Sequence, residues 1–228
     1  MSLDTDDASD ANATMGGFAH VDVPTAEIDR IEAVQAPLVA AVRRLVDVAI
    51  RTRAEGAELD AAVAGIVAAT DRLAADAADG PAGVRFNSEG RSWNWGNAAV
   101  GVRNAVAPPL AVRFVDDTHV EGAADLGTAY EGPPGLVHGG VSALLLDHLM
   151  GETASRHHTQ TTFTGTLTMR YEAPLPLGPV VLHGELTHQE GRKVHVTASI
   201  SAADGPVSVS ATGVFVIPRW AVDLWEQA

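Results

Sequence analysis

One short segment concentrates residue types that could act on a carbonyl group. Residues 130–140 read YEGPPGLVHGG, with four glycines and two prolines. The last two glycines precede a predicted helix, whose first amides have no partner within the helix and lie at the positive end of its dipole. Such amides can stabilise a carbonyl oxygen that becomes negative during nucleophilic attack. Glycines alone favour an ordinary helix entry, so a second chemical group is needed to indicate a site.

Asp147 is the candidate for that second group. It lies on the helix that follows the glycines, roughly 120° from the centre of the predicted apolar face at 100° per residue. Periodicity alone favours a solvated charge on the flank of the helix. The alternative is a carboxylate at the mouth of a cleft, where it could attack a carbonyl carbon or activate a water molecule.

The elements around this segment indicate an α+β domain. The helix that begins after Gly140 carries an apolar face of Val141, Leu144, Leu145, His148 and Leu149. Alternating apolar and polar residues predict half-buried antiparallel strands, over residues 110–115, 161–173, 179–189, 194–201 and 207–215. Asp204-Gly205-Pro206 predicts a hairpin turn between the last two strands. The helix is the only element placed to cover the sheet.

A helical extension precedes this domain. Apolar residues at three- and four-residue spacing predict two helices between residues 28 and 79, with Pro37 at a start or kink of the first and Gly56 between them. We therefore expect four parts: a disordered acidic N-terminus over 1–23, helices and a loop over 24–90, the α+β domain over 91–217 and a tail over 218–228.

The composition excludes several classes of function. The chain has 15 basic and 29 acidic residues and a net charge of -14, which opposes nonspecific binding to nucleic acid. It has no cysteine, so disulfides, thiolate metal sites and a cysteine nucleophile are excluded. No apolar run predicts a membrane span, and the first residues do not resemble a signal peptide, so we expect a cytoplasmic protein.

Other residues with chemical potential favour structural interpretations. His157 and His158 are adjacent, but no second cluster at ligand spacing accompanies them, so we expect no metal site. Ser142 and Ser155 lack the context of a nucleophile elbow, which argues against a Ser-His-Asp hydrolase.

Residues 132–151, GPPGLVHGGVSALLLDHLMG, resemble the signature of the hot-dog acyl-CoA thioesterases, in the branch of the phenylacetate-pathway and Them-type enzymes. In that family a His-Gly-Gly loop enters a central helix, and a catalytic carboxylate follows nine residues after the histidine, as Asp147 follows His138. A strand with Thr164 leads into Tyr171-x-x-Pro-x-Pro, and Gly-Arg-Lys at 191–193 is similar to a family turn. The resemblance covers about residues 95–217.

The resemblance implies a hot-dog fold, an antiparallel sheet wrapped around a central helix, that hydrolyses an acyl-CoA thioester. The Gly139 amide would polarise the thioester carbonyl, with Gly140 beside it in substrate binding. Asp147 would be nucleophile or general base, Thr164 would orient the water or the carboxylate, and His138 would line the site.

The resemblance also suggests how coenzyme A is held. Arg192 and Lys193 are candidates for binding its phosphates, and an ordinary basic hairpin turn is an equally weighted interpretation. We expect no separate cofactor, because coenzyme A is part of the substrate.

One further function class stays open beside the hydrolase, and a third is disfavoured. A non-catalytic acyl-CoA or lipid-binding protein could use the same scaffold, since a fold does not fix a function. A hydratase or dehydratase is disfavoured, because the paired histidine and acid of that chemistry are not found here.

The family implies at least a two-fold symmetric homodimer with the site at the subunit boundary. One chain would give Asp147 and the other the His138–Gly140 loop, or the reverse. The helices of residues 28–79 would cap the acyl tunnel or extend the dimer interface, or they would only stabilise the domain.

Overall fold

The computed structural model describes residues 18–225, which form two compact units. Among the described residues, the first unit comprises residues 18–97 and 101–105, and the second comprises residues 98–100 and 106–225. Residues 1–17 and 226–228, which hold most of the expected disordered segment and the end of the expected tail, lie outside the described residues.

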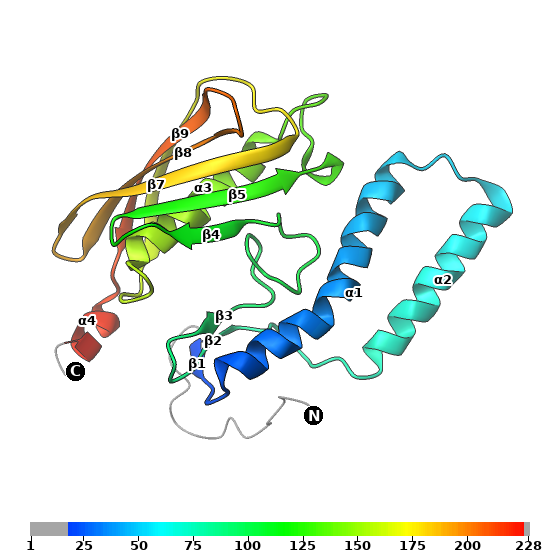
Figure 1. Cartoon of the computed structure of the whole chain (residues 1–228), viewed down its shortest axis with the longest axis horizontal. Helices are drawn as coiled ribbons and strands as arrows, with labels where there is room; N and C mark the ends of the chain where they lie inside the picture. Colours follow the sequence, from blue (N-terminus) through cyan, green and yellow to red (C-terminus); the bar gives the residue numbers. More distant parts are fainter. Residues whose placement is uncertain (1–17, 226–228) are drawn as a thin grey trace. The chain divides into compact units, whose positions relative to one another are not determined.

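The second unit is an antiparallel sheet that packs against one long helix, α3 (Gly139–Ser155) (Figure 1). Its six strands lie in the order β4-β5-β7-β8-β9-β6. Their bounds are β4 Ala111–Phe114, β5 His119–Leu126, β6 Phe163–Tyr171, β7 Gly178–Glu190, β8 Lys193–Ala202 and β9 Val207–Val216. A 3-10 turn (Thr128–Tyr130) precedes α3, and α4 (Arg219–Trp225) follows β9.

The buried face of α3 is rotated from the predicted one. Leu145 and Leu149 are buried as expected, but Val141, Leu144 and His148 are only half-buried. The rest of the buried face consists of Ser142, Leu146, Met150, Thr153 and Ala154. Thr153 accounts for part of the error, because it lies where the helix and the sheet approach closely and a count of apolar residues does not include it.

Gly184 on β7 shows how close this approach is. A Cβ atom at Gly184 would lie 2.5 Å from the Thr153 hydroxyl oxygen. That hydroxyl donates to the Leu149 carbonyl at 2.8 Å, so its polar group is satisfied within the helix.

The predicted strands of the C-terminal half are all present, with one error in register. Val194, Val196 and Ile200 of β8 are buried against α3, as the alternation predicts. Val207 of β9, however, is exposed and Ser208 is buried. A register shift between Ile200 and Ser201 in the β8–β9 pairing inverts the alternation at this end of the hairpin.

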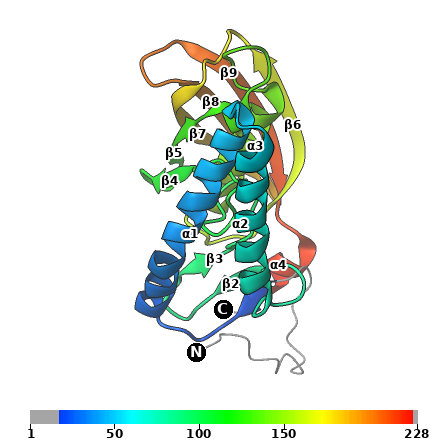
Figure 2. The same ribbon diagram turned by 90° about the vertical axis from the view of Figure 1, so that its right-hand side faces the viewer.

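The first unit contains the predicted helical hairpin, formed by α1 (Thr25–Arg51) and α2 (Gly56–Ala74) (Figures 1 and 2). Pro37 lies inside α1, so it does not start the helix. The second helix ends at Ala74, a few residues before the predicted end of the helical segment at residue 79.

The first unit also contains a small three-stranded sheet. Its strands are β1 (Phe18–His20), β2 (Val84–Phe86) and β3 (Ser92–Trp93), and β1 pairs in parallel with β2. A cluster of Ile28, Trp93 and Trp95 packs beside Val21 and Val23. Residues 18–23 are therefore ordered rather than part of a disordered segment, because Val21 and Val23 contribute apolar side chains that the acidic composition around them conceals.

Candidate functional site

Asp147 and Thr164 lie together at the edge of the sheet. Asp147 is half-buried on the flank of α3, and the Thr164 hydroxyl on β6 donates to its Oδ1 at 2.8 Å. A hydrogen bond to a charged carboxylate is stronger than one between neutral groups. The threonine therefore fixes one carboxylate oxygen, and within residues 18–225 no protein group donates a hydrogen bond to the other.

A bulge in β6 turns Thr164 towards the helix. Leu167, Met169 and Tyr171 alternate on the side of β6 that faces α3, and by simple alternation Thr164 would face away. The pairing of β6 with β9 shifts register between Thr164 and Thr166, which reverses the direction of Thr164. A bulge of this kind can direct a side chain into a site, and an alternation count cannot predict it.

The start of α3 presents one amide that no group within the described residues 18–225 accepts from. His138 is the N-cap residue, and its Nδ1 accepts from the Gly140 N–H at 2.9 Å. In a neutral imidazole the hydrogen then lies on Nε2. The Val141 N–H donates to the His138 carbonyl. Within residues 18–225 the Gly139 N–H donates to no protein acceptor, so it is available to a ligand at the positive end of the helix.

Tyr171 holds this turn from the other end of β6. Its hydroxyl donates to the Gly139 carbonyl at 3.0 Å, and a Cβ atom at position 139 would lie 3.1 Å from its ring. The sequence suggested Tyr171 only as part of a motif. Its contact with Gly139 shows that the motif holds the glycine loop in place.

A pocket of about 400 Å³ opens at this end of α3. Its lining includes Leu136, Gly139, Ser142, Tyr171, Leu175 and Val209, so it is mostly apolar and reaches the free amide. Asp147 does not line it.

Gly139 and Asp147 are too far apart along one helix to act on the same carbonyl. They are eight residues apart, so at 1.5 Å per residue they are separated by about 12 Å along the axis of α3. A catalytic group needs to come within about 3 Å of the reacting atoms. The described chain therefore brings Asp147 together with Thr164, and Gly139 with Tyr171, as two separate half-sites.

The Arg192-Lys193 turn lies at the Asp147 end of the sheet. Lys193 pairs with Val216 of β9, and Val216 pairs with Phe163 of β6, next to Thr164. Two strand spacings of about 4.8 Å separate Lys193 from Phe163 along this row. Both basic side chains are exposed, and Arg192 also donates to the Ile217 carbonyl at 2.8 Å.

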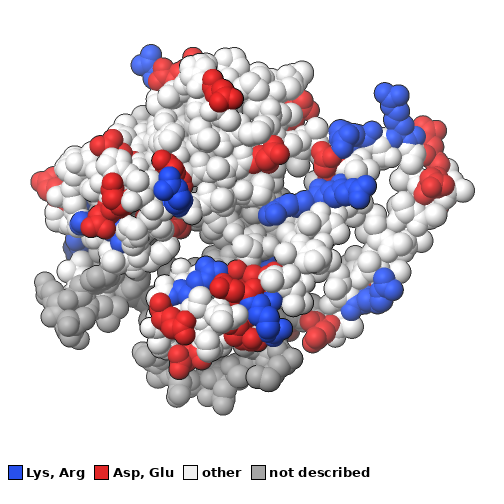
Figure 3. Space-filling model, in the orientation of Figure 1, with Lys and Arg blue, Asp and Glu red and all other residues white. Residues whose placement is uncertain are grey.

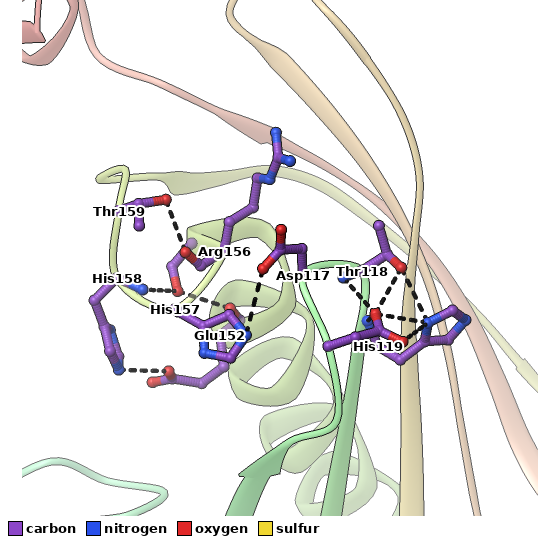
Figure 4. Close-up of polar contacts among 10 residues, drawn as sticks. Asp117, Thr118, His119, Glu152, Arg156, His157, His158 and Thr159 are labelled. Carbon is purple, nitrogen blue, oxygen red and sulfur yellow. Dashed lines mark hydrogen bonds and ion pairs between the residues drawn. The ribbon is translucent and has the colours of Figure 1, made fainter.

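A second polar cluster lies near the C-terminal end of α3 (Figure 4). The carboxylate of Glu152 is 3.4 Å from Nε2 of His148 and 3.4 Å from Nε2 of His158. Burial raises the pKa of Glu152, but the nearby imidazole of His148 and the positive charges of His158 and His148 together lower it below its ordinary value.

The segment after α3 presents His157 and His158 from an unusual backbone. Arg156, His157 and His158 all have positive φ angles, of 48°, 58° and 60°. His157 stacks on Phe114 with ring centroids 4.4 Å apart, and its Nε2 is 3.8 Å from Asp117. Among the described residues, no group of three or more histidine, aspartate or glutamate side chains is arranged to hold a metal ion.

Comparison with known proteins identifies the family. Residues 134–209 match the thioesterase superfamily. The crystal structure of a thioesterase superfamily protein is 34% identical, with a TM-score of 0.69 over 80% of this chain and 90% of that chain. The chain belongs to the thioesterase superfamily. The predicted hot-dog fold is confirmed by this match and by the packing of α3 on the antiparallel sheet.

Curated members of the superfamily match a shorter stretch. Acyl-coenzyme A thioesterase THEM4 of Xenopus laevis is 37% identical over 92 residues, which cover 40% of this chain and 41% of the relative. THEM4 of Bos taurus is 32% identical over 92 residues, which cover 40% of this chain and 37% of the relative. The match thus spans about two fifths of the length of these curated relatives. None of the described helices is both long enough and apolar enough to cross a bilayer.

Proposed function

We propose that this thioesterase superfamily member hydrolyses an acyl-CoA thioester to a free acid and coenzyme A. The observation that carries the proposal is the 2.8 Å hydrogen bond between Thr164 and Asp147, which holds a carboxylate on the helix whose first amide is free. The curated relatives named as acyl-coenzyme A thioesterases support the same substrate class.

The chemistry divides between the two half-sites. The Gly139 N–H stabilises the thioester oxygen as it becomes negative. Asp147 acts in one of two ways. As general base it takes a proton from water, the hydroxide attacks the carbonyl carbon, the C–S bond breaks and the proton passes to the leaving thiolate. As nucleophile its carboxylate attacks the carbonyl carbon, the C–S bond breaks and the coenzyme A thiolate leaves and takes up a proton from water. Water then hydrolyses the resulting anhydride, which releases the free acid and regenerates the Asp147 carboxylate.

A second copy of the chain completes the site. Thr164 with Asp147 and Tyr171 with Gly139 lie at opposite ends of β6, which is the edge strand of the sheet. If two β6 edges meet about a two-fold axis near Leu167 and Thr168, Thr164 of one copy lies opposite Tyr171 of the other. Each of the two sites then receives a carboxylate from one chain and an amide from its partner.

Coenzyme A binds with its phosphates near the β7–β8 turn. Arg192 and Lys193 supply positive charge at the Asp147 end of the sheet in a chain whose net charge is -14. A guanidinium and an ammonium group both pair well with phosphate, and here both are exposed to solvent.

The test is the turnover of Asp147→Asn against a panel of acyl-CoA thioesters, followed by the release of free thiol. We expect normal folding and a loss on the order of 10²–10⁴ in kcat, because a positioned base or nucleophile is removed. Asp125→Asn, which changes an exposed carboxylate on β5, is the matched control and should keep wild-type turnover.

Two results would contradict the proposal. A wild-type protein that binds acyl-CoA but hydrolyses no member of the panel would be a binding protein rather than a hydrolase. An Asp147→Asn variant with near-normal turnover would remove Asp147 from the mechanism.

A further inference from the structure

The helical hairpin exposes an unusual amount of apolar side chain. Eleven large apolar residues on α1 and α2 are between 37% and 65% exposed. They are Val34, Leu38, Val42, Leu45, Val48 and Ile50 on α1, and Leu59, Val63, Ile66, Val67 and Leu73 on α2. No residue of α2 is buried, so the described chain provides no core for this helix.

The spacing of these residues fits packing against other helices. On α2 the seam is Leu59, Val63, Ile66, Thr70 and Leu73, spaced four, three, four and three residues apart. This alternation is the heptad pattern, in which side chains of one helix insert between those of another. The opposite face of α2 has small residues such as Ala61 and Ala68.

Such a helix is not expected to persist alone in water. Most of the stability of a protein helix comes from packing its apolar face, and an isolated helix of this length is marginal. A standard interface takes on the order of 800 Å² from each partner, over about 20–30 residues a side, and the eleven exposed apolar side chains would form the centre of such a surface. The hairpin therefore offers enough apolar surface for a stable interface of its own.

The charges beside the apolar stripes indicate what covers them. The C-terminal half of α1 carries Arg43, Arg44 and Arg51 against one acid, Asp47, so its net charge is positive. Within the same chain Arg43 donates to the Asn104 carbonyl at 3.3 Å and Arg51 pairs with Asp47. Along α2 stand Glu58, Asp60 and Asp71 against one base, Arg72. The basic half of α1 is therefore complementary to the acidic α2 of another copy. Figure 3 shows uncharged surface along the hairpin, with basic and acidic side chains grouped along it.

We propose that the α1–α2 hairpin is an association surface for a second copy of this chain, so that two hairpins form an antiparallel four-helix bundle. The Leu59–Leu73 seam of each copy packs between the helices of the other, and α1 of each copy faces the acidic α2 of its partner. This interface is separate from the edge of β6. It supplies no group to the proposed catalytic site, so it can be tested independently of hydrolysis.

The first experiment compares two double variants of the full chain by sedimentation velocity over a range of concentrations. Val63→Glu with Ile66→Glu places two charges in the α2 seam, and Ala61→Glu with Ala68→Glu places the same charges on the opposite face. We expect the seam variant to lose an association step, or to weaken it by about tenfold or more, since two buried aliphatic contacts are replaced by charges. The opposite-face variant should assemble like the wild type.

The second experiment measures the accessibility of single cysteines, which is possible because the chain has no cysteine of its own. In I66C and A61C a single thiol per chain reports its own accessibility to a maleimide reagent. We expect the thiol of I66C to react many-fold more slowly than that of A61C, and to approach the faster rate on dilution.

Three outcomes would overturn the proposal. The seam variant could assemble as the wild type does. The two thiols could react equally fast at every concentration, which would leave the seam uncovered. The thiol of I66C could stay protected in a dilute monomer, which would place the seam against a part of its own chain. Acyl-CoA hydrolysis, measured in parallel, reports the proposed function separately.

Discussion

Thr164 reaches Asp147 only because the backbone of β6 bulges beside it. The family resemblance named both residues from sequence, but the physical reason for their contact, the register shift between Thr164 and Thr166, cannot be read from alternation. Gly165 lies in this bulge, where a Cβ atom would be 3.1 Å from the Val214 carbonyl oxygen and the Val216 side chain. The close approach explains a glycine at a position where a strand pattern alone would favour a β-branched residue.

Removing the Thr164 hydroxyl should impair turnover without preventing folding. Thr164→Val keeps the shape of the side chain but leaves Asp147 without its donor, and a hydrogen bond to a charged group contributes about 1.5–3 kcal/mol. We expect kcat to fall roughly tenfold to a hundredfold, with little change in KM. Thr164→Ser retains the hydroxyl and should restore most of the rate. If both variants lose activity equally, Thr164 acts through packing rather than through its bond to Asp147.

The helices and strands that were predicted correctly from the sequence are those whose buried side chains are large. Leu145 and Leu149 of α3 and the valines of β8 form the core as predicted. The residues 119–126, which form β5, were not among the predicted strands, since Gly122 and Ala124 carry too little apolar area to produce a clear alternation. A Cβ atom at Gly122 would lie 3.1–3.2 Å from Leu110, Leu149 and Leu182, so the absence of a side chain there is a packing requirement.

The β7–β8 turn provides a prediction at the scale of an element. Lys193→Ala should raise the KM for acyl-CoA more than it lowers kcat, because a phosphate contact far from the reacting carbon contributes to binding alone. The KM of the wild type should also rise with salt, since the charge is exposed. Arg192→Ala should in addition destabilise the fold by about 1 kcal/mol, because it loses the bond to the Ile217 carbonyl.

The control for this turn lies at the other edge of the sheet. Arg113 is exposed on β4, the strand farthest from β6, and pairs with Glu121. Arg113→Ala removes the same charge and should leave the KM unchanged. A KM that responds to Arg113→Ala and not to Lys193→Ala would move the phosphate site to β4.

At the scale of the whole molecule, neither the sequence nor the structure of one chain shows how Gly139 and Asp147 come together, or what covers the apolar stripes of the hairpin. The family resemblance implies that one chain gives Asp147 and the other the His138–Gly140 loop, and the helix of a single chain keeps Gly139 and Asp147 about 12 Å apart, but one chain does not show how the two meet. The apolar stripes of the hairpin are visible in the sequence, but their partner is not, because periodicity reports that a face is buried and not against what. Both questions concern the assembly, for which a sequence pattern carries little information.

A mixed dimer tests whether two chains share each site. Gly139→Pro removes the free N–H at the first helical position, where proline fits the helix and His138, at φ -62° and ψ 133°, suits the residue before a proline. Its ring requires Tyr171 to shift slightly, which the 57% exposure of that side chain allows. Copies with Gly139→Pro alone and copies with Asp147→Asn alone should each form inactive homodimers.

A heterodimer of the two variants, isolated by two different affinity tags after co-expression, should regain activity. One of its sites combines Asp147 of the Gly139→Pro copy with the Gly139 amide of the Asp147→Asn copy, and the other site carries both defects. We therefore expect about half of the wild-type turnover from the purified heterodimer if the sites are independent. If each chain used its own carboxylate and its own amide, both sites would be defective and the heterodimer would stay as inactive as its parents. Circular dichroism of each homodimer provides the control that both variants fold.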